Sequence, residues 1–155
     1  MSANTAKRKT KSRKKKSKKS KKPKVHTQGY WKRQLDPLMS KLIRSKLVCE
    51  RCGRRGDLST FDDAHVVGRK NLTLRWDILN HLCLCFQCHR YFWHEEPLEA
   101  AKWFQEKFPN RYIYLMKAKN IIVKRTEENY KELREWIKNK EIRKLTLPLD
   151  KLDSI

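Results

Sequence analysis

The sequence has 155 residues, with 39 lysines and arginines against 17 aspartates and glutamates and a formal net charge of +22 at pH 7. Only 38% of the residues are hydrophobic, which predicts a small core that needs a disulfide or metal crosslink to be stable. No run approaches the roughly 18 apolar residues of a membrane span, and no secretion signal precedes the basic residues, so we expect neither a membrane protein nor a secreted one.

Residues 1–24 contain thirteen lysines and arginines and no acidic residue. Like charges repel, and this stretch offers nothing apolar to bury, so it is predicted to be a disordered arm. The positive charge favours a partner rich in phosphate, and the arm is interpreted as neutralising DNA phosphates. A solubilising tail and a nuclear-localisation signal are the alternatives.

The first predicted helix begins at Asp36, as the N-cap, with Pro37 at the first helical position. Its apolar face carries Leu38, Leu42 and Ile43. Basic side chains on this helix, among them Arg44, are interpreted as exposed to solvent; contact with phosphate is the alternative.

Two Cys-x-x-Cys pairs, Cys49 with Cys52 and Cys85 with Cys88, predict a structural zinc site, because thiolates at this spacing can both reach one tetrahedral ion. Redox-active thiols or another ligand set are the alternatives. Cys83 has the wrong spacing for the site and is predicted to be a buried free thiol. Metal-binding cysteines also indicate a reducing compartment.

Between these pairs, residues 61–67 are predicted to form a strand, residues 68–70 a turn and residues 81–85 a second strand, with residues 72–76 extending the hairpin. Asp77 is a plausible cap for a short turn. A helix is expected from residue 85 to about residue 91 or 94. The predicted unit is a β-hairpin followed by a helix, held together by zinc.

Beyond residue 97 the spacing of apolar residues predicts two further helices, while residues 110–120 are ambiguous between strand and helix. The first covers residues 98–108, and Thr126 caps the second, which follows it. The aromatic side chains of this part are interpreted as core in preference to base-stacking platforms. The expected buried faces carry Leu98, Ala101, Phe104 and Phe108 in the first helix and Tyr130, Leu133 and Ile137, with Trp136 beside them, in the second.

The central stretch also carries residue types suited to hydrolysis of a phosphodiester, which needs a base to activate water and a divalent ion to stabilise charge. Histidine has the pKa for the first task, and carboxylates and a further histidine suit the second. Asp62, Asp63 and His65 stand together, with His89 expected to face them across the hairpin. Asn80 lies between and is expected to orient His65 or to fix the loop through backbone bonds.

The order Asp-Ala-His, then Asn, then Cys-x-x-Cys-His resembles the HNH (ββα-metal) endonucleases, particularly the phage recombination endonuclease VII and NinG types. The resemblance covers roughly residues 49–94. It implies that His65 is the general base, Asn80 the structural residue of the triad and His89 a ligand of the catalytic metal. Many members place a metal-binding aspartate where this chain has Ala64, so Asp63, or Asp62 as its substitute, would have to supply the carboxylate. His94 is a further candidate ligand.

Three basic residues near this site, Arg69, Lys70 and Arg75, are candidates for contacts to DNA phosphates. The sequence thus predicts an α+β protein with a basic arm (1–24), a zinc-bound HNH nuclease domain (30–96) and a helical C-terminal extension (97–155). The expected cofactors are a structural Zn²⁺ and a catalytic Mg²⁺ or other divalent ion, and the expected partner is DNA, with branched recombination intermediates as one substrate. A homodimer is an option, since two opposed strands would need two cuts.

The expected location is the cytoplasm, that of the host cell if a phage encodes the chain, or the nucleus if the source is eukaryotic. Two other functions fit parts of the same sequence. A non-catalytic zinc ribbon that binds nucleic acid would have the same cysteines and basic tail, but it gives no reason for the acid and histidine spacing. The other alternative is a catalytically silent relative of the HNH endonucleases.

Overall fold

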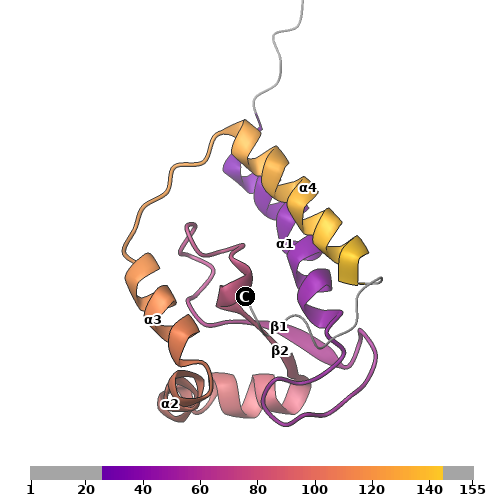
Figure 1. The fold of residues 1–155 in the computed structure, drawn as a ribbon, viewed down its shortest axis with the longest axis vertical. Helices are drawn as coiled ribbons and strands as arrows, with labels where there is room; N and C mark the ends of the chain where they lie inside the picture. Colours follow the sequence, from indigo (N-terminus) through magenta and orange to yellow (C-terminus); the bar gives the residue numbers. More distant parts are fainter. Residues whose placement is uncertain (1–25, 145–155) are drawn as a thin grey trace, which may run out of the picture.

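The computed structural model describes residues 26–144, with side chains up to residue 140, so the predicted arm and residues 145–155 lie outside the described residues. The protein is α+β: a two-stranded antiparallel sheet lies between α1 and α4 on one side and α2 and α3 on the other (Figure 1). In chain order the elements are α1 (Gln28–Arg44), β1 (Phe61–His65), the 3-10 helix η1 (Ile78–Asn80), β2 (His81–Cys85), the π-helix η2 (Cys88–His94), α2 (Pro97–Lys107), α3 (Pro109–Ala118) and α4 (Glu127–Lys144).

The predicted hairpin is present, with Phe61 paired to Cys85 and His65 paired to His81. Strand β1 is shorter than predicted. It stops at His65 because the next two backbone N–H groups turn away to Asn80: Val66 donates to its carbonyl at 2.9 Å and Val67 to its Oδ1 at 2.6 Å. Residues 72–76, expected to extend the hairpin, form turns instead.

Helix α1 begins eight residues before the predicted start, with Thr27 as its N-cap, and Pro37 lies inside the helix. The prediction of a cap at Asp36 was wrong because that carboxylate bonds to distant side chains of the loop after β1. A proline inside a helix costs about 3 kcal/mol, and burial of a long apolar face offsets it. The residues of that face are Trp31, Leu35, Met39, Leu42 and Ile43.

Helix α4 lies alongside α1 and closes the core (Figure 1). Its Tyr130 stacks on Trp31 with ring centroids 5.4 Å apart and meets Trp76 edge-on at 5.7 Å. Ile137 is fully buried. The predicted cap is confirmed, since Thr126 Oγ1 accepts a hydrogen bond from the Asn129 N–H at 3.3 Å. The C-terminal segment therefore contributes to the same core as the hairpin.

The ambiguous segment at residues 110–120 is helical as α3, and α2 packs against both α3 and η2. The expected face of α2 was wrong in part: Leu98 is 84% exposed, whereas Ala100 and Phe104 are buried. Phe104 sets the phase of this helix, because its ring packs on Trp93 of η2 at 6.3 Å and on Phe108 at 5.5 Å.

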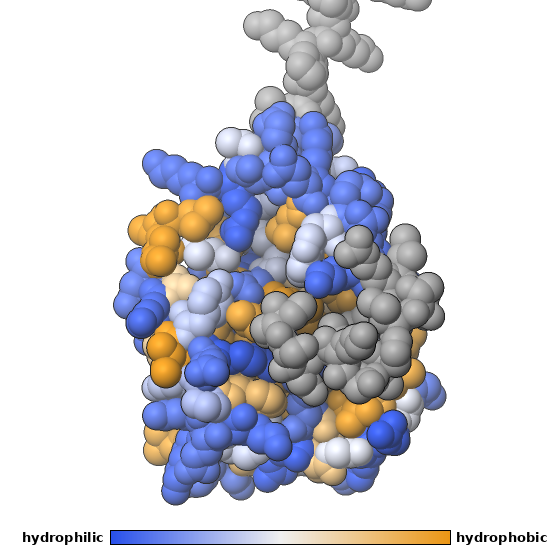
Figure 2. Space-filling model, viewed as in Figure 1, coloured by the Kyte–Doolittle hydropathy of each residue, from blue (hydrophilic) through white to orange (hydrophobic). Residues whose placement is uncertain are grey.

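The visible face in Figure 2 is mainly hydrophilic, with apolar patches where the connection between α3 and α4 runs. The exposed apolar residues of that connection are Ile121, Ile122 and Val123. Within the described residues, no helix has both the length and the apolar character needed to cross a membrane.

Candidate active site and metal centre

The four cysteines of the two Cys-x-x-Cys pairs meet in space, with their sulfur atoms all within 4.8 Å of one another. The first pair lies on a tight turn in which the Gly53 N–H donates to the Cys49 carbonyl at 2.9 Å, and Gly53 has a φ of 72°, where a side chain would be strained. The predicted four-cysteine cluster is confirmed, and its donors suit a structural metal such as zinc.

The surroundings of this cluster favour a cation. Cys49, Cys85 and Cys88 are buried, and burial raises the pKa of Cys88 to about 12. Four adjacent thiolates would repel one another in such a setting, and a divalent ion removes that cost. Cys83 is fully buried and outside the cluster, and burial raises its pKa to about 12, which agrees with the predicted inert thiol.

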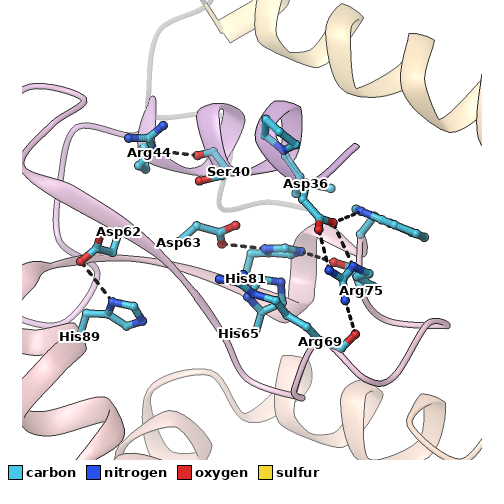
Figure 3. A pocket seen from close by; sticks show the side chains of 13 residues that line it. Asp36, Ser40, Arg44, Asp62, Asp63, His65, Arg69, Arg75, His81 and His89 are labelled. Atoms are coloured by element: carbon cyan, nitrogen blue, oxygen red, sulfur yellow. Dashed lines mark hydrogen bonds and ion pairs between the residues drawn. The ribbon is translucent and has the colours of Figure 1, made fainter. Parts of the chain in front are cut away.

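A separate cleft of about 290 Å³ opens between α1 and the hairpin (Figure 3). It combines acids, histidines and arginines from four parts of the chain: α1, β1, the loop after β1, and the β2–η2 segment. Its polar lining is Asp36, Ser40, Arg44, Asp62, Asp63, His65, Arg69, Arg75, His81 and His89.

His65 stands at the end of β1, and its ring lies 4.3 Å from the ring of His81, its partner across the hairpin. Burial, and then the positive charge of His81, lower the pKa of His65 from 6.5 to about 4, although Asp63 acts in the opposite direction. The imidazole is therefore neutral at pH 7 and has a lone pair available to accept a proton.

His81 is the cleft residue that the sequence analysis did not single out. Its Nδ1 is 2.7 Å from Asp63 Oδ1, and its Nε2 is 3.0 Å from the carbonyl oxygen of Arg75. A carbonyl only accepts, so Nε2 is the donor in the contact with Arg75, and Nδ1 faces the carboxylate of Asp63. Asp63, His65 and His81 do offer ligand atoms within 4.8 Å, but both nitrogens of His81 are already engaged.

Asp62, the neighbour of Asp63 on β1, contacts a different histidine. Asp62 Oδ2 lies 3.1 Å from His89 Nδ1, and His89 Nε2 lies 3.1 Å from His94 Nε2. The π-helix accounts for the second contact, because its i to i+5 repeat brings residues five apart onto one face. Asp62 and His89 thus form a second pair in the cleft, distinct from the pair formed by Asp63 and His81 (Figure 3), and His94 extends it beyond the cleft lining.

Asn80 is fully buried and faces the backbone of the loop that follows β1. Its side-chain amide donates to the carbonyls of Val67 at 2.9 Å and Leu74 at 3.0 Å, while its Oδ1 accepts from the Val67 N–H. It therefore holds the loop beside His65 and does not itself line the cleft.

The predicted phosphate contacts differ in their surroundings. Arg69 and Lys70 are exposed in the turn after β1, and Arg69 lines the cleft. Arg75 is held by Asp36, with nitrogen–oxygen distances of 2.6 and 2.9 Å. Burial alone would raise the pKa of Asp36, but hydrogen bonds from Arg75 and Trp76 keep it below its ordinary value. Arg44, half-buried on α1, adds a further guanidinium to the cleft.

Comparison with known proteins gives no relative. No protein-family model matches this sequence, and no curated protein and no solved structure matches it. The function therefore has to be argued from the cleft and the cysteine cluster themselves.

Proposed function

We propose that this chain is a metal-dependent DNA endonuclease of the HNH type, which hydrolyses phosphodiester bonds. The observation that carries the proposal is the convergence of a neutral histidine, two acids and a further histidine in one cleft lined by arginines. This is the combination that phosphodiester hydrolysis needs: a base for water, donors for a divalent ion, and cations for the phosphate.

His65 is the proposed general base. Its Nε2 or Nδ1 lone pair takes a proton from a water molecule as the water oxygen attacks phosphorus and the bond from phosphorus to the leaving oxygen breaks. The leaving oxygen then collects a proton from solvent, so the products are a phosphate monoester and an alcohol. The low pKa of His65 keeps the ring unprotonated over the whole neutral range, which is the form that the step requires.

The donors for a catalytic ion are Asp62 and His89, with His94 as the next donor along the chain of contacts. A carboxylate beside an imidazole suits Mg²⁺, Mn²⁺ or Zn²⁺. Asp63, preferred by the sequence pattern, is bonded to His81, so Asp62 is the better candidate for the carboxylate ligand. When bound, the ion supplies a Lewis acid that stabilises charge on the phosphate and the leaving oxygen.

The remaining cleft residues hold this arrangement in place. The pair of His81 and Asp63 forms the wall against which the His65 ring lies, and Asn80 fixes the loop after His65. Arg69 and Arg44 are the proposed phosphate contacts, and the net charge of +22 attracts DNA to the cleft.

The test is cleavage of a supercoiled plasmid, a linear duplex and a four-way junction by the zinc-loaded protein with Mg²⁺ or Mn²⁺. His65→Ala should lower the rate by about 10² to 10⁴, the usual contribution of a general base. The matched control is His26→Ala, which removes a histidine that bonds to Glu127 of α4 outside the cleft. Wild-type protein that binds DNA but cuts none of the substrates would refute the nuclease and leave the zinc-ribbon binder. A His65→Ala variant as active as wild type would refute the role of His65 as the general base.

A further inference from the structure

Two large aromatic side chains, Phe86 and Tyr91, are exposed on the segment that carries His89. They are 61% and 55% exposed, and their rings meet edge to face with centroids 6.1 Å apart. A chain with so small a core would gain stability by burying such rings, since each can bury about 150–250 Å². Their exposure therefore needs an explanation beyond folding.

Beside them lies a second depression of about 430 Å³, here called the zinc-loop hollow. It is formed by the first cysteine turn and by the start of η2. Its lining residues are Arg51, Cys52, Arg54, Gln87, Cys88, Tyr91, Phe92 and Glu96. None of these residues lines the catalytic cleft, although Cys88 directly precedes the cleft residue His89.

The arginines of the hollow are held in place. Arg51 lies over the ring of Phe92, with its Cζ 3.5 Å from the ring centroid, and donates to Cys88 Sγ at 3.6 Å. Arg54 donates to Gln87 Oε1 at 3.1 Å and is otherwise exposed. Glu96 is the one acid of the lining, so the hollow combines two guanidinium groups, one carboxylate and an aromatic ring with a second ring at its edge.

Exposed rings next to ordered arginines match the chemistry of an unpaired nucleotide strand. Bases stack on aromatic faces whatever their sequence, and guanidinium groups pair with the phosphates between them. A paired duplex offers no free base faces, so the rings would gain little from it. An apolar protein partner would meet Arg51, Arg54 and Glu96 among the rings, and burying them unpaired is costly.

We infer that the zinc-loop hollow binds single-stranded DNA, with bases on Phe86 and Tyr91 and phosphates on Arg51 and Arg54. The inference rests on the proposed nuclease function and narrows its substrate class to DNA with an unpaired stretch near the cut. Residues of the segment 87–92 line both depressions, His89 the cleft and Gln87 and Cys88 the hollow, so one substrate that changes from duplex to single strand at this segment would occupy both.

The test is binding without added Mg²⁺ or Mn²⁺, so that cleavage plays no part in the readout. The full zinc-loaded chain is titrated into a labelled twelve-nucleotide oligo(dT) and into a blunt hairpin duplex, with fluorescence anisotropy at fixed salt. The double variant Phe86→Ala/Tyr91→Ala should bind oligo(dT) at least about tenfold more weakly, because one stacked base contributes about 1–3 kcal/mol. Duplex affinity should change by less than about twofold on the same stacking argument.

Two control variants separate stacking from general damage. Tyr91→Phe keeps the ring and should keep the affinity for oligo(dT), and Trp136→Ala removes an exposed aromatic of α4 that is not in the hollow. Zinc content and circular dichroism confirm that each variant is folded. Equal losses on both DNAs, no loss on oligo(dT), or no single-strand binding by the wild type would overturn the inference. Failure of the nuclease would appear separately, as an inert protein that still prefers oligo(dT) through these two rings.

Discussion

The cysteine cluster and the cleft between α1 and the hairpin both contain potential metal ligands, but they are built in opposite ways. In the cluster four sulfurs converge, three of them on buried cysteines, and Arg51 donates to one of them, Cys88 Sγ. In the cleft the ligand atoms are already paired with each other: Asp63 with His81, and Asp62 with His89. The cluster consists of four cysteines, whereas the cleft is also lined by arginines.

This difference is the one expected between the proposed structural metal site and the proposed substrate-binding site. Structural zinc sites enclose the ion with protein donors only, whereas catalytic sites keep positions open for water and substrate. Two neighbours on one strand show the same contrast within the cleft: the Asp63 side chain is 7% exposed and the Asp62 side chain is 45% exposed. Three experiments test how far the contrast holds.

The largest effect is expected from loss of the zinc ligands. Cys85→Ser should abolish zinc binding and unfold the domain, because metal binding at such sites contributes on the order of 10 kcal/mol to folding. Cys83→Ala is the matched control: it lies two residues away on β2, is equally buried, and is outside the cluster. Zinc content by atomic absorption and thermal unfolding by circular dichroism distinguish the two. A folded, zinc-free Cys85→Ser protein would contradict the structural role.

A smaller effect separates the two adjacent aspartates. Asp63→Asn removes one charge of a buried pair and should lower the free energy of unfolding by about 3 kcal/mol. Asp62→Asn breaks a half-exposed contact and should cost less than about 1 kcal/mol. Binding of Mn²⁺, followed by calorimetry, should fall for Asp62→Asn and survive at neutral pH in the folded fraction of Asp63→Asn. If Asp62→Asn instead lowered stability more and Asp63→Asn lost Mn²⁺ binding, the ligand role would belong to Asp63.

The third test concerns pH. Burial and the nearby charges of His81, Arg69 and Arg75 lower the pKa of folded His65 to about 4, against 6.5 in the unfolded chain. Between these two values the unfolded chain binds a proton that the folded protein does not, so this histidine makes the fold less stable as the pH falls from 6.5 towards 4. His65→Gln should show a shallower loss of stability than wild type over that interval in urea unfolding. Direct titration of the ring by NMR should give a midpoint near pH 4, and a midpoint near 6.5 would refute the burial argument.

Local patterns in the sequence predicted much of the fold. Cys-x-x-Cys spacing predicted the cluster, alternation and turn residues predicted the hairpin, and the Thr126 cap predicted the start of α4. Each of these depends on residues close together in the chain. The start of α1 was missed because Asp36 and Pro37 give a local start signal that burial of a long apolar face overrides.

The cleft was only partly predictable, because its contacts join residues that lie far apart in the chain. Residue types and spacing selected His65, Asn80, His89 and the two aspartates, but not which acid faces which histidine. That depends on the register of the hairpin, which sets His81 opposite His65, and on the π-helix, which sets His94 beside His89. His81 itself gives no local signal, since a histidine on a buried strand is ordinarily a packed residue.

The sequence by itself determined the basic charge, the cysteine pairs that could hold a metal and the order of the acid, asparagine and histidine positions, because these follow from residue identity and short spacing. Only the tertiary structure decided that Asp63 supports the wall of the cleft while Asp62 faces His89, and that Phe86 and Tyr91 stay exposed beside Arg51 and Arg54. The physical reason is that side-chain pairing and burial depend on which elements lie against each other, and α1, the hairpin and η2 are brought together only by the core they share.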